Sequence, residues 1–174
     1  MKRLFLMAIV TIFATAAFAG NPLKVVDGNK KFFKTTEGKV FLEVVFDNNA
    51  TYDDKMPLSE KYRDLDAKVV IAYDGFIEEF NDNNSKMTFV KDEAEADYKM
   101  IINVTKVDEF YNPMGWIAGP CVRVWGTLTV TDTKTGDTMI VVDIDEIDGG
   151  SSPTTDRAFN DTFGELGEKI AKLK

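Results

Sequence analysis

The chain contains no histidine and a single cysteine among its 174 residues. The missing histidine excludes Ser-His-Asp and Cys-His catalytic groups, and it excludes zinc or iron sites that depend on histidine ligands. One cysteine excludes an intramolecular disulfide, a Cys-x-x-Cys redox pair and a four-cysteine metal site. We therefore expect no cofactor, and a fold that is held together by its hydrophobic core.

Basic residues are also in short supply, with 21 Lys and Arg against 29 Asp and Glu and a formal net charge of −8. Because nucleic-acid affinity comes mostly from neutralising phosphates with Lys and Arg, we do not expect a nucleic acid as a partner. Hydrophobic residues make up 44% of the chain and charged residues 29%, which is typical of a globular protein. The length favours one domain.

The first 19 residues have the parts of a secretory signal peptide. A basic start that includes Lys2 precedes an apolar run over residues 4–18, and Ala17-Phe18-Ala19 matches a small-residue cleavage site. The apolar run is short against the ~20 residues that a membrane-spanning helix needs, which favours cleavage over anchoring. We expect an exported protein, periplasmic or secreted, with no transmembrane span after cleavage.

Apolar and polar residues alternate over five segments of the remaining chain, which predicts five strands. Residues 20–38 have few apolar anchors, so we expect a loosely held N-terminal arm with at most one short strand. Residues 39–174 are then expected to form a single domain. The predicted strands cover residues 39–46, 86–90, 98–107, 121–131 and 138–147.

Two further segments have the three- and four-residue spacing of apolar side chains that is typical of amphipathic helices. The first runs from Glu60 to about Phe80, with Ser59 as its expected N-cap, and the second begins after Thr154 or Thr155. The predicted fold is therefore α+β, with a mixed, mostly antiparallel sheet of about five strands and both helices packed on one face.

Several spacings in the second half of the chain resemble those of a known group of exported bacterial domains. Ala96-Asp97-Tyr98 opens a strand, residues 122–130 lead into Asp132-x-x-x-Gly136, and a Gly-Ser loop precedes the closing helix. The pattern is similar to the domain shared by the curli secretion channel protein, the lipoprotein activators of penicillin-binding proteins, the amino-terminal domain of TolB and related bacterial envelope families. The resemblance implies a non-catalytic adaptor or assembly factor of the cell envelope, with another envelope protein as its partner.

Many members of that group are lipoproteins, whereas no cysteine follows the apolar run of this chain. The chain therefore departs from the group at the position that would tether it to a membrane. Whether the protein forms a homo-oligomer is left open by the sequence.

The segment 110–120 combines chain-breaking residues with large apolar side chains, a combination suited to binding a protein partner, a membrane surface or a second copy of the chain. The alternative is that this loop folds back and buries Trp116 in the core. On the adjacent predicted strand, alternation places Arg123 and Trp125 on the outward face. The candidate binding residues are Tyr111, Met114, Trp116, Ile117, Arg123 and Trp125.

Carboxylates are densest over residues 143–148, where Asp143, Asp145 and Asp148 are weak candidates for a calcium site. The pattern does not match an EF-hand, because Ile147 occupies a ligand position, and the same residues suit a solvated sheet face or a protected edge. The alternative function is a small hydrolase of envelope glycans, which would need two carboxylates about 5 to 9.5 Å apart across a cleft. Cys121 is expected to be buried and inert.

Overall fold

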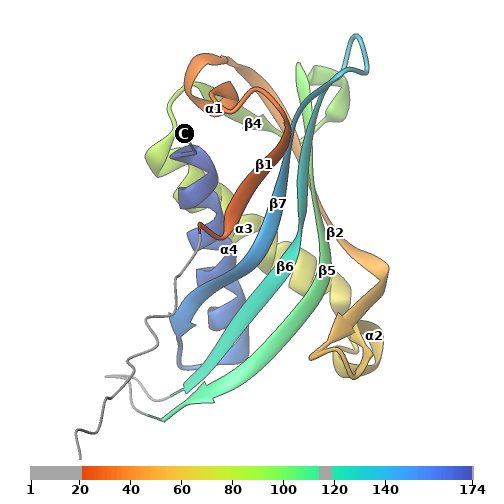
Figure 1. Cartoon of the computed structure of the whole chain (residues 1–174), viewed down its shortest axis with the longest axis vertical. Coiled ribbons are helices and arrows are strands. Elements are labelled where there is room, and N and C mark those ends of the chain that lie inside the picture. The colour runs from red at the N-terminus through yellow and green to blue at the C-terminus, as the bar shows by residue number, and fades with distance from the viewer. Residues whose placement is uncertain (1–20, 114–118, 174) are drawn as a thin grey trace, which may run out of the picture.

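A single curved sheet of seven strands organises the protein, whose computed structural model describes residues 21–113 and 119–173 (Figure 1). The strand order is β1-β7-β6-β5-β2-β3, and β4 pairs with β2 at one edge. Strand β2 is parallel to β4 and β5, and the other neighbouring pairs are antiparallel. The strands are β1 (Leu23–Gly28), β2 (Gly38–Tyr52), β3 (Met56–Pro57), β4 (Met87–Val90), β5 (Tyr98–Asn112), β6 (Gly119–Asp132) and β7 (Thr138–Ser151).

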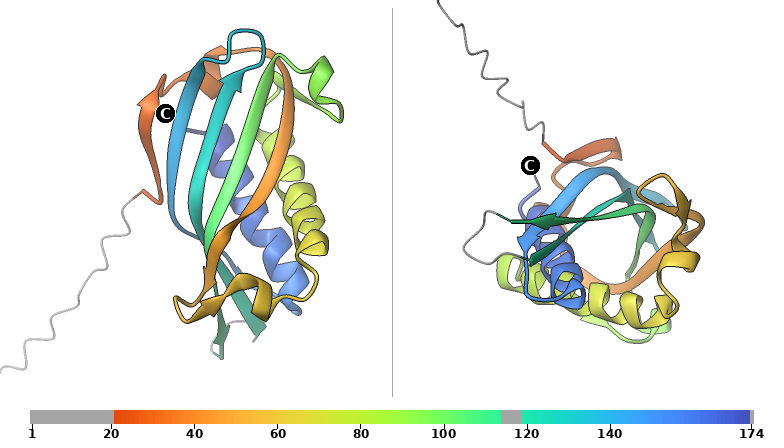
Figure 2. Two further views of the ribbon diagram at one scale, coloured as in Figure 1. Left: turned by 90° about the vertical axis from the view of Figure 1, so that its right-hand side faces the viewer. Right: turned by 90° about the horizontal axis from the view of Figure 1, so that it is seen from below.

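The two long helices lie side by side on one face of the sheet, and the opposite face is open (Figure 2). They approach closely because two glycines lie at their contact: a side chain at Gly75 would collide with the carbonyl oxygen of Asn160, and one at Gly167 with that of Phe76. The helices are α1 (Phe32–Thr35), α2 (Leu58–Lys61), α3 (Leu65–Asn83) and α4 (Thr155–Ala171), with a short 3₁₀ turn at Glu93–Glu95.

The core fills the space between these helices and the inner face of the sheet. Strand alternation is confirmed on β6, where Val122, Val124, Leu128 and Val130 are at most 1% exposed. Transfer of such apolar side chains out of water supplies most of the stability of a fold without disulfides. The largest buried side chains include Phe32, Phe33, Phe76, Phe80, Phe159 and Phe163.

The α+β prediction is confirmed, but the predicted count of about five strands is wrong, because β1 and β3 join the same sheet. Strand β1 comes from the expected arm, which is not loosely held: Leu23 pairs with Ile144, and Phe32 is 1% exposed. A bulge between Val25 and Asp27 breaks the alternation that would have indicated this strand. Strand β3 is too short to produce any pattern.

The first long helix is also shorter than predicted. Tyr62 has an extended backbone after α2, and Asp64 then caps α3 by accepting a hydrogen bond of 3.0 Å from the N–H of Ala67. Ser59 lies inside α2 and is not an N-cap. The closing helix is confirmed with Thr154 as its N-cap. Across the residues described, no helix is long and apolar enough to span a bilayer.

Candidate functional site

An arginine held between aromatic rings lies on the open face of the sheet, where β5 and β6 run antiparallel. The register sets Asp108 opposite Arg123 and Lys106 opposite Trp125, so these four side chains share that face. We call the following group the Arg123 cluster: Lys106, Asp108, Phe110, Arg123, Trp125 and Glu146.

Cation–π contacts join the members of the Arg123 cluster. The Arg123 guanidinium carbon is 4.5 Å from the centroid of the Phe110 ring and 5.8 Å from that of Trp125. On the other side, Lys106 Nζ is 4.5 Å from the Trp125 centroid. Contacts of this kind stabilise a particular side-chain arrangement by about 0.5–1 kcal/mol each at exposed sites. These contacts hold the side chains of the Arg123 cluster in one arrangement.

Two carboxylates complete the surroundings of Arg123. The guanidinium donates hydrogen bonds to Asp108, which is 8% exposed, and to Glu146 Oε1 at 3.0 Å. Glu146 has a left-handed backbone (φ 60°) in the irregular part of β7 that faces Val124 and Gly126. A left-handed conformation is unfavourable for a residue with a side chain, so local contacts must hold it. The ion pair with Arg123 is one such contact.

The end of the β5–β6 pair exposes two consecutive aromatic residues. Phe110 is 37% exposed and Tyr111 is 64% exposed, and alternation along the strand turns them to opposite faces. The segment 110–120 is thus not wholly a loop, because β5 continues to Asn112 and β6 begins at Gly119. The strands extend because residues 108–112 stay paired with residues 119–123.

The structure brings together only part of the predicted binding set. Arg123 and Trp125 share the outer face, whereas Tyr111 lies at the same end on the other face. Met114, Trp116 and Ile117 lie outside the described residues, and their participation stays a prediction. Sequence reasoning missed Phe110 as a partner of Arg123, although its two-residue spacing from Asp108 was a signal for a shared face.

A second polar network lies behind the same strand. Glu109 accepts a hydrogen bond from the Tyr62 hydroxyl, and Lys61 Nζ is 3.4 Å from Glu109 Oε2. The Tyr62 ring also meets the Phe159 ring edge-on at 5.4 Å. Burial, and then the hydrogen bond to Glu109, raise the pKa of Tyr62 well above its ordinary value. These contacts attach the segment after α2 to β5 and α4, which is a structural role.

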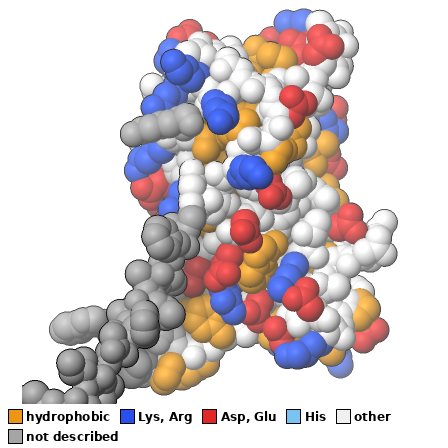
Figure 3. Space-filling model, in the orientation of Figure 1, with side chains coloured by type: hydrophobic (Ala, Val, Ile, Leu, Met, Phe, Trp, Pro, Cys, Tyr) orange, Lys and Arg blue, Asp and Glu red, His pale blue; other side chains and the backbone are white. Residues whose placement is uncertain are grey.

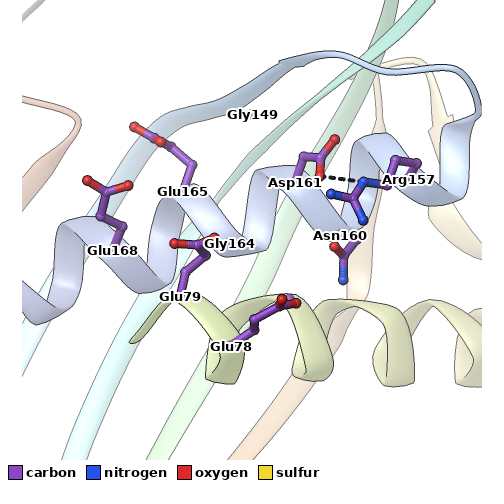
Figure 4. Close-up of a pocket in the computed structure, with 10 residues that line it drawn as sticks. Glu78, Glu79, Gly149, Arg157, Asn160, Asp161, Gly164, Glu165 and Glu168 are labelled. Atoms are coloured by element: carbon purple, nitrogen blue, oxygen red, sulfur yellow. Dashed lines mark ion pairs between the residues drawn. The ribbon is translucent and has the colours of Figure 1, made fainter. Parts of the chain in front are cut away.

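Carboxylates also line a groove between α3 and α4, with a volume of about 270 Å³ (Figure 4). Glu78 and Glu79 come from α3 and Glu165 from α4, and Arg157 Nε is 2.8 Å from Asp161 Oδ1 across one turn of α4. A glycosidase acid needs apolar surroundings that keep its carboxyl group protonated. This groove is lined by charged, amide and glycine residues, so it gives no support to the hydrolase alternative.

The carboxylates proposed for calcium do not converge. Asp143 lies opposite Thr127, the N–H of Asp145 donates to the carbonyl of Pro22, and Asp148 accepts from the N–H of Gly150. Within residues 21–113 and 119–173, no three side chains of His, Cys, Asp or Glu are placed to hold a metal ion. The weak metal assignment of Asp143, Asp145 and Asp148 therefore has no geometric basis.

Cys121 is 1% exposed, as expected, and lies opposite Phe110 on β5. Desolvation by burial raises the pKa of its thiol, which keeps the thiol protonated and unreactive at neutral pH.

The surface of the molecule is mixed in character. On the face shown in Figure 3, hydrophobic side chains form separate areas between acidic and basic ones.

Comparison with solved structures finds distant likenesses. The PelC dodecamer from Paraburkholderia phytofirmans matches with a TM-score of 0.44 and 12% identity, over 85% of this chain and 95% of that chain. A DUF330 protein from Xanthomonas campestris matches with a TM-score of 0.41 and 11% identity, over 78% of this chain and 82% of that chain. Likeness at this level does not establish a shared function.

No protein-family model matches the chain, and no curated protein is significantly similar to it in sequence. PelC and the DUF330 protein lie outside the groups that the sequence resembles. The resemblance to the curli channel, penicillin-binding-protein activator and TolB domains therefore stays a prediction.

Proposed function

We propose that this domain is a non-catalytic binding module that contacts another protein through the Arg123 cluster and the exposed end of β5. The observation that carries the proposal is the guanidinium of Arg123 held 4.5 Å from a Phe110 ring that is itself 37% exposed. Arg, Trp and Tyr dominate the energetics of protein interfaces. The cluster presents Arg and Trp together on the outer face, and Tyr111 is exposed at the same end of β5 on the other face.

Order within the cluster favours binding, because side chains that are already immobilised lose less conformational entropy when a partner docks. The carboxylates of Asp108 and Glu146 fix the guanidinium in place, while Phe110 and Tyr111 offer apolar area at the end of the sheet. Charged groups at the border of such a surface favour one partner orientation over others.

We also propose that the protein is exported to the cell envelope. The predicted signal peptide over residues 1–19 lies outside the described residues, and it supports an exported protein whose partner is another envelope protein. The resemblance to exported adaptor domains supports the same role. Self-association remains a further proposal, and light scattering of the mature protein would measure it directly.

Affinity capture of the mature protein from detergent-solubilised envelopes tests the binding surface. We expect a partner that the wild type and Val26→Ser retain and that Phe110→Ser and Arg123→Met lose. Val26 is the matched control, since it is 53% exposed on β1, away from the cluster. The purified partner should then bind the wild type at least tenfold more tightly than Phe110→Ser, because truncated interface hot spots cost about 2 kcal/mol or more. Equal binding by all four proteins would contradict the proposal.

A further inference from the structure

Lysines line a groove where α1 meets the ends of α3 and α4. The groove has a volume of about 590 Å³, and the charged residues that line it are Lys34 of α1, Lys86 after α3 and Lys172 after α4. Among the residues described, no acidic side chain lines it. In a protein with a formal net charge of −8, this groove is a local reversal of charge. In Figure 3, basic side chains gather at the upper left, where Figure 1 shows α1 and the end of α4.

Unpaired lysines concentrate in the segment that leads to this groove. Ion pairs hold most lysines of the described chain, and four of the five exceptions lie within residues 24–34. Lys31 and Lys34 are both exposed and, being three residues apart, lie on the same side of α1. The charge of Lys34 is therefore not paired with any described carboxylate. The five exceptions are Lys24, Lys30, Lys31, Lys34 and Lys91.

Three acidic residues lie close to the groove along the chain without lining it. Glu37 is 3.6 Å from Lys86 Nζ, but the two side chains are 74% and 43% exposed, so this pair is weak. Glu168 pairs with Lys172 from one turn back along α4, and Asp82 lies in the last turn of α3. The C-terminal ends of α3 and α4 add about half a negative charge each. Because the lysines line the groove and the carboxylates do not, a ligand in the groove is closer to the positive charges.

The rest of the lining suits a short stretch of polypeptide. Phe33 and Ala171 are 1% and 6% exposed, so the floor of the groove is part of the core. The Ser85 hydroxyl has no hydrogen-bond partner within the described part of the chain, and it can therefore bond with a backbone amide of a ligand. The stems of the lysines add apolar surface along the rim.

We propose that this groove binds an acidic segment of a partner protein, with carboxylates that reach Lys34, Lys86 and Lys172 and an apolar side chain over Phe33. One of these carboxylates takes the place of Glu37 beside Lys86. Because the protein as a whole is acidic, repulsion elsewhere steers such a segment towards the groove. Occupancy of the groove does not depend on the Arg123 cluster.

Other anionic occupants fit the groove less well. A planar lipid bilayer cannot enter a groove, and an inorganic anion fills little of a site whose volume lies in the range of roughly 300–1,000 Å³ that is typical of ligand pockets. A second copy of this chain carries acidic segments, but two chains with a formal net charge of −8 repel each other. A separate protein with a short acidic segment meets neither obstacle.

Two labelled octapeptides test the proposal on the mature protein: acetyl-DLEDLEDL-amide and its neutral counterpart acetyl-NLQNLQNL-amide. We expect the acidic peptide to bind at least tenfold more tightly, because several exposed charge pairs, each worth about two- to fivefold in affinity, act together. Addition of the acidic peptide should shift the backbone amides of Lys34, Ser85 and Lys172 in NMR spectra.

Charge-removing variants locate the binding site. Lys34→Gln should weaken binding of the acidic peptide by about threefold, and Lys34→Gln combined with Lys86→Gln by about tenfold. Both lysines are exposed, so these variants should fold. Arg63→Gln is the matched control: it removes the same charge from an exposed position just before α3, at the opposite end of that helix, and should leave binding unchanged. Phe110→Ser should also leave it unchanged, which separates this site from the Arg123 cluster.

Several results would overturn the assignment. These are no binding of the acidic peptide, equal binding of the two peptides, or a loss in Arg63→Gln as large as that in Lys34→Gln. Vesicles of phosphatidylcholine and phosphatidylglycerol form a second arm of the test. If they bind the wild type but not Lys34→Gln, and the acidic peptide does not compete, a lipid surface is the occupant. Self-association that Lys34→Gln breaks would show that a second copy occupies the groove, which also contradicts the proposal.

Discussion

Asp108 and Glu109 are neighbours on β5, yet they serve the two faces of the sheet in different ways. Asp108 points to the open face and pairs with Arg123, while Glu109 points to the helices and accepts from Tyr62. Each carboxylate has a basic partner and an aromatic neighbour. The two pairs differ in their surroundings. The ring beside Glu109, that of Tyr62, contacts the buried Phe159 ring of α4, whereas the ring beside Asp108, that of Phe110, is exposed.

The comparison shows that the same side-chain chemistry stabilises the fold on one face and remains accessible on the other. On the inner face, the buried Phe159 ring contacts the Tyr62 ring edge-on, so the Tyr62–Glu109 network is continuous with the core. The outer face of the sheet, which carries Phe110 and Trp125, is not covered by the two long helices (Figure 2). We expect substitutions of the buried inner rings to reduce stability most, and substitutions of the exposed outer rings to affect mainly binding.

The largest effect is expected from Phe159→Ala, which removes a fully buried ring beneath Tyr62. Loss of such a side chain lowers the free energy of unfolding by about 3–5 kcal/mol. Urea unfolding measures it, with Phe110→Ala as the matched control on the outer face. The control should lose less than about 1 kcal/mol, as most substitutions at exposed positions do. Similar losses for both variants would remove the distinction between the faces.

A smaller loss is expected from Arg123→Met. The substitution leaves the carboxylate of Asp108, which is 8% exposed, without its cation. An unsatisfied buried polar group costs about 1–3 kcal/mol. In an Asp108→Asn background the same substitution should cost clearly less, and this double-mutant cycle by thermal unfolding isolates the pair. Equal costs in the two backgrounds would place the origin of the loss elsewhere.

The inner network predicts a dependence on alkaline pH. Because the pKa of Tyr62 is raised in the folded state, the hydroxyl stays protonated above pH 10 while the unfolded chain ionises there. Stability is therefore complete below pH 10 and falls above it, by about 1.4 kcal/mol per pH unit for one group. Urea unfolding between pH 9 and pH 11 (~1 unit on each side of that ordinary value) should show this extra slope in the wild type. If the Tyr62→Phe variant shows the same loss of stability with rising pH, groups other than Tyr62 cause that loss.

The smallest effect is expected from Glu146→Gly. Glycine relieves the left-handed backbone by about 1 kcal/mol, and the lost ion pair with Arg123, half exposed at Glu146, is worth about 0–1 kcal/mol. The two changes oppose each other, so we expect the melting temperature to change little. A loss above about 1 kcal/mol would show that the Glu146 carboxylate contributes more to stability than an exposed ion pair does.

The periodic elements of this fold were predictable from sequence, because long buried faces leave clear patterns. Residues 121–131 alternate cleanly, and residues 155–171 repeat with helical spacing. Strand β1 was not predictable, since a bulge at Val26 interrupts its alternation and its partner β7 is remote in sequence. The break between α2 and α3 was hidden for a related reason: Tyr62 leaves the helix to reach Glu109, a contact that no local pattern encodes.

The candidate site was predictable only in part. Alternation correctly placed Arg123 and Trp125 on the outer face. The positions of their neighbours Phe110 and Glu146 could not be predicted. Phe110 is placed by the register of β5 on β6, which depends on the length of the connection between these strands. Glu146 is placed by an irregularity in β7, which depends on tertiary contacts.

The pairing of β1 with β7 has a consequence for how the chain folds. Leu23 lies opposite Ile144, so the first strand to be synthesised can be hydrogen-bonded only after nearly the whole chain has emerged. Closing so long a loop is entropically costly and makes contacts of this type form late. The amino-terminal strand therefore pairs late in folding, which would suit unfolded passage through a membrane if the signal peptide predicted over residues 1–19 directs export.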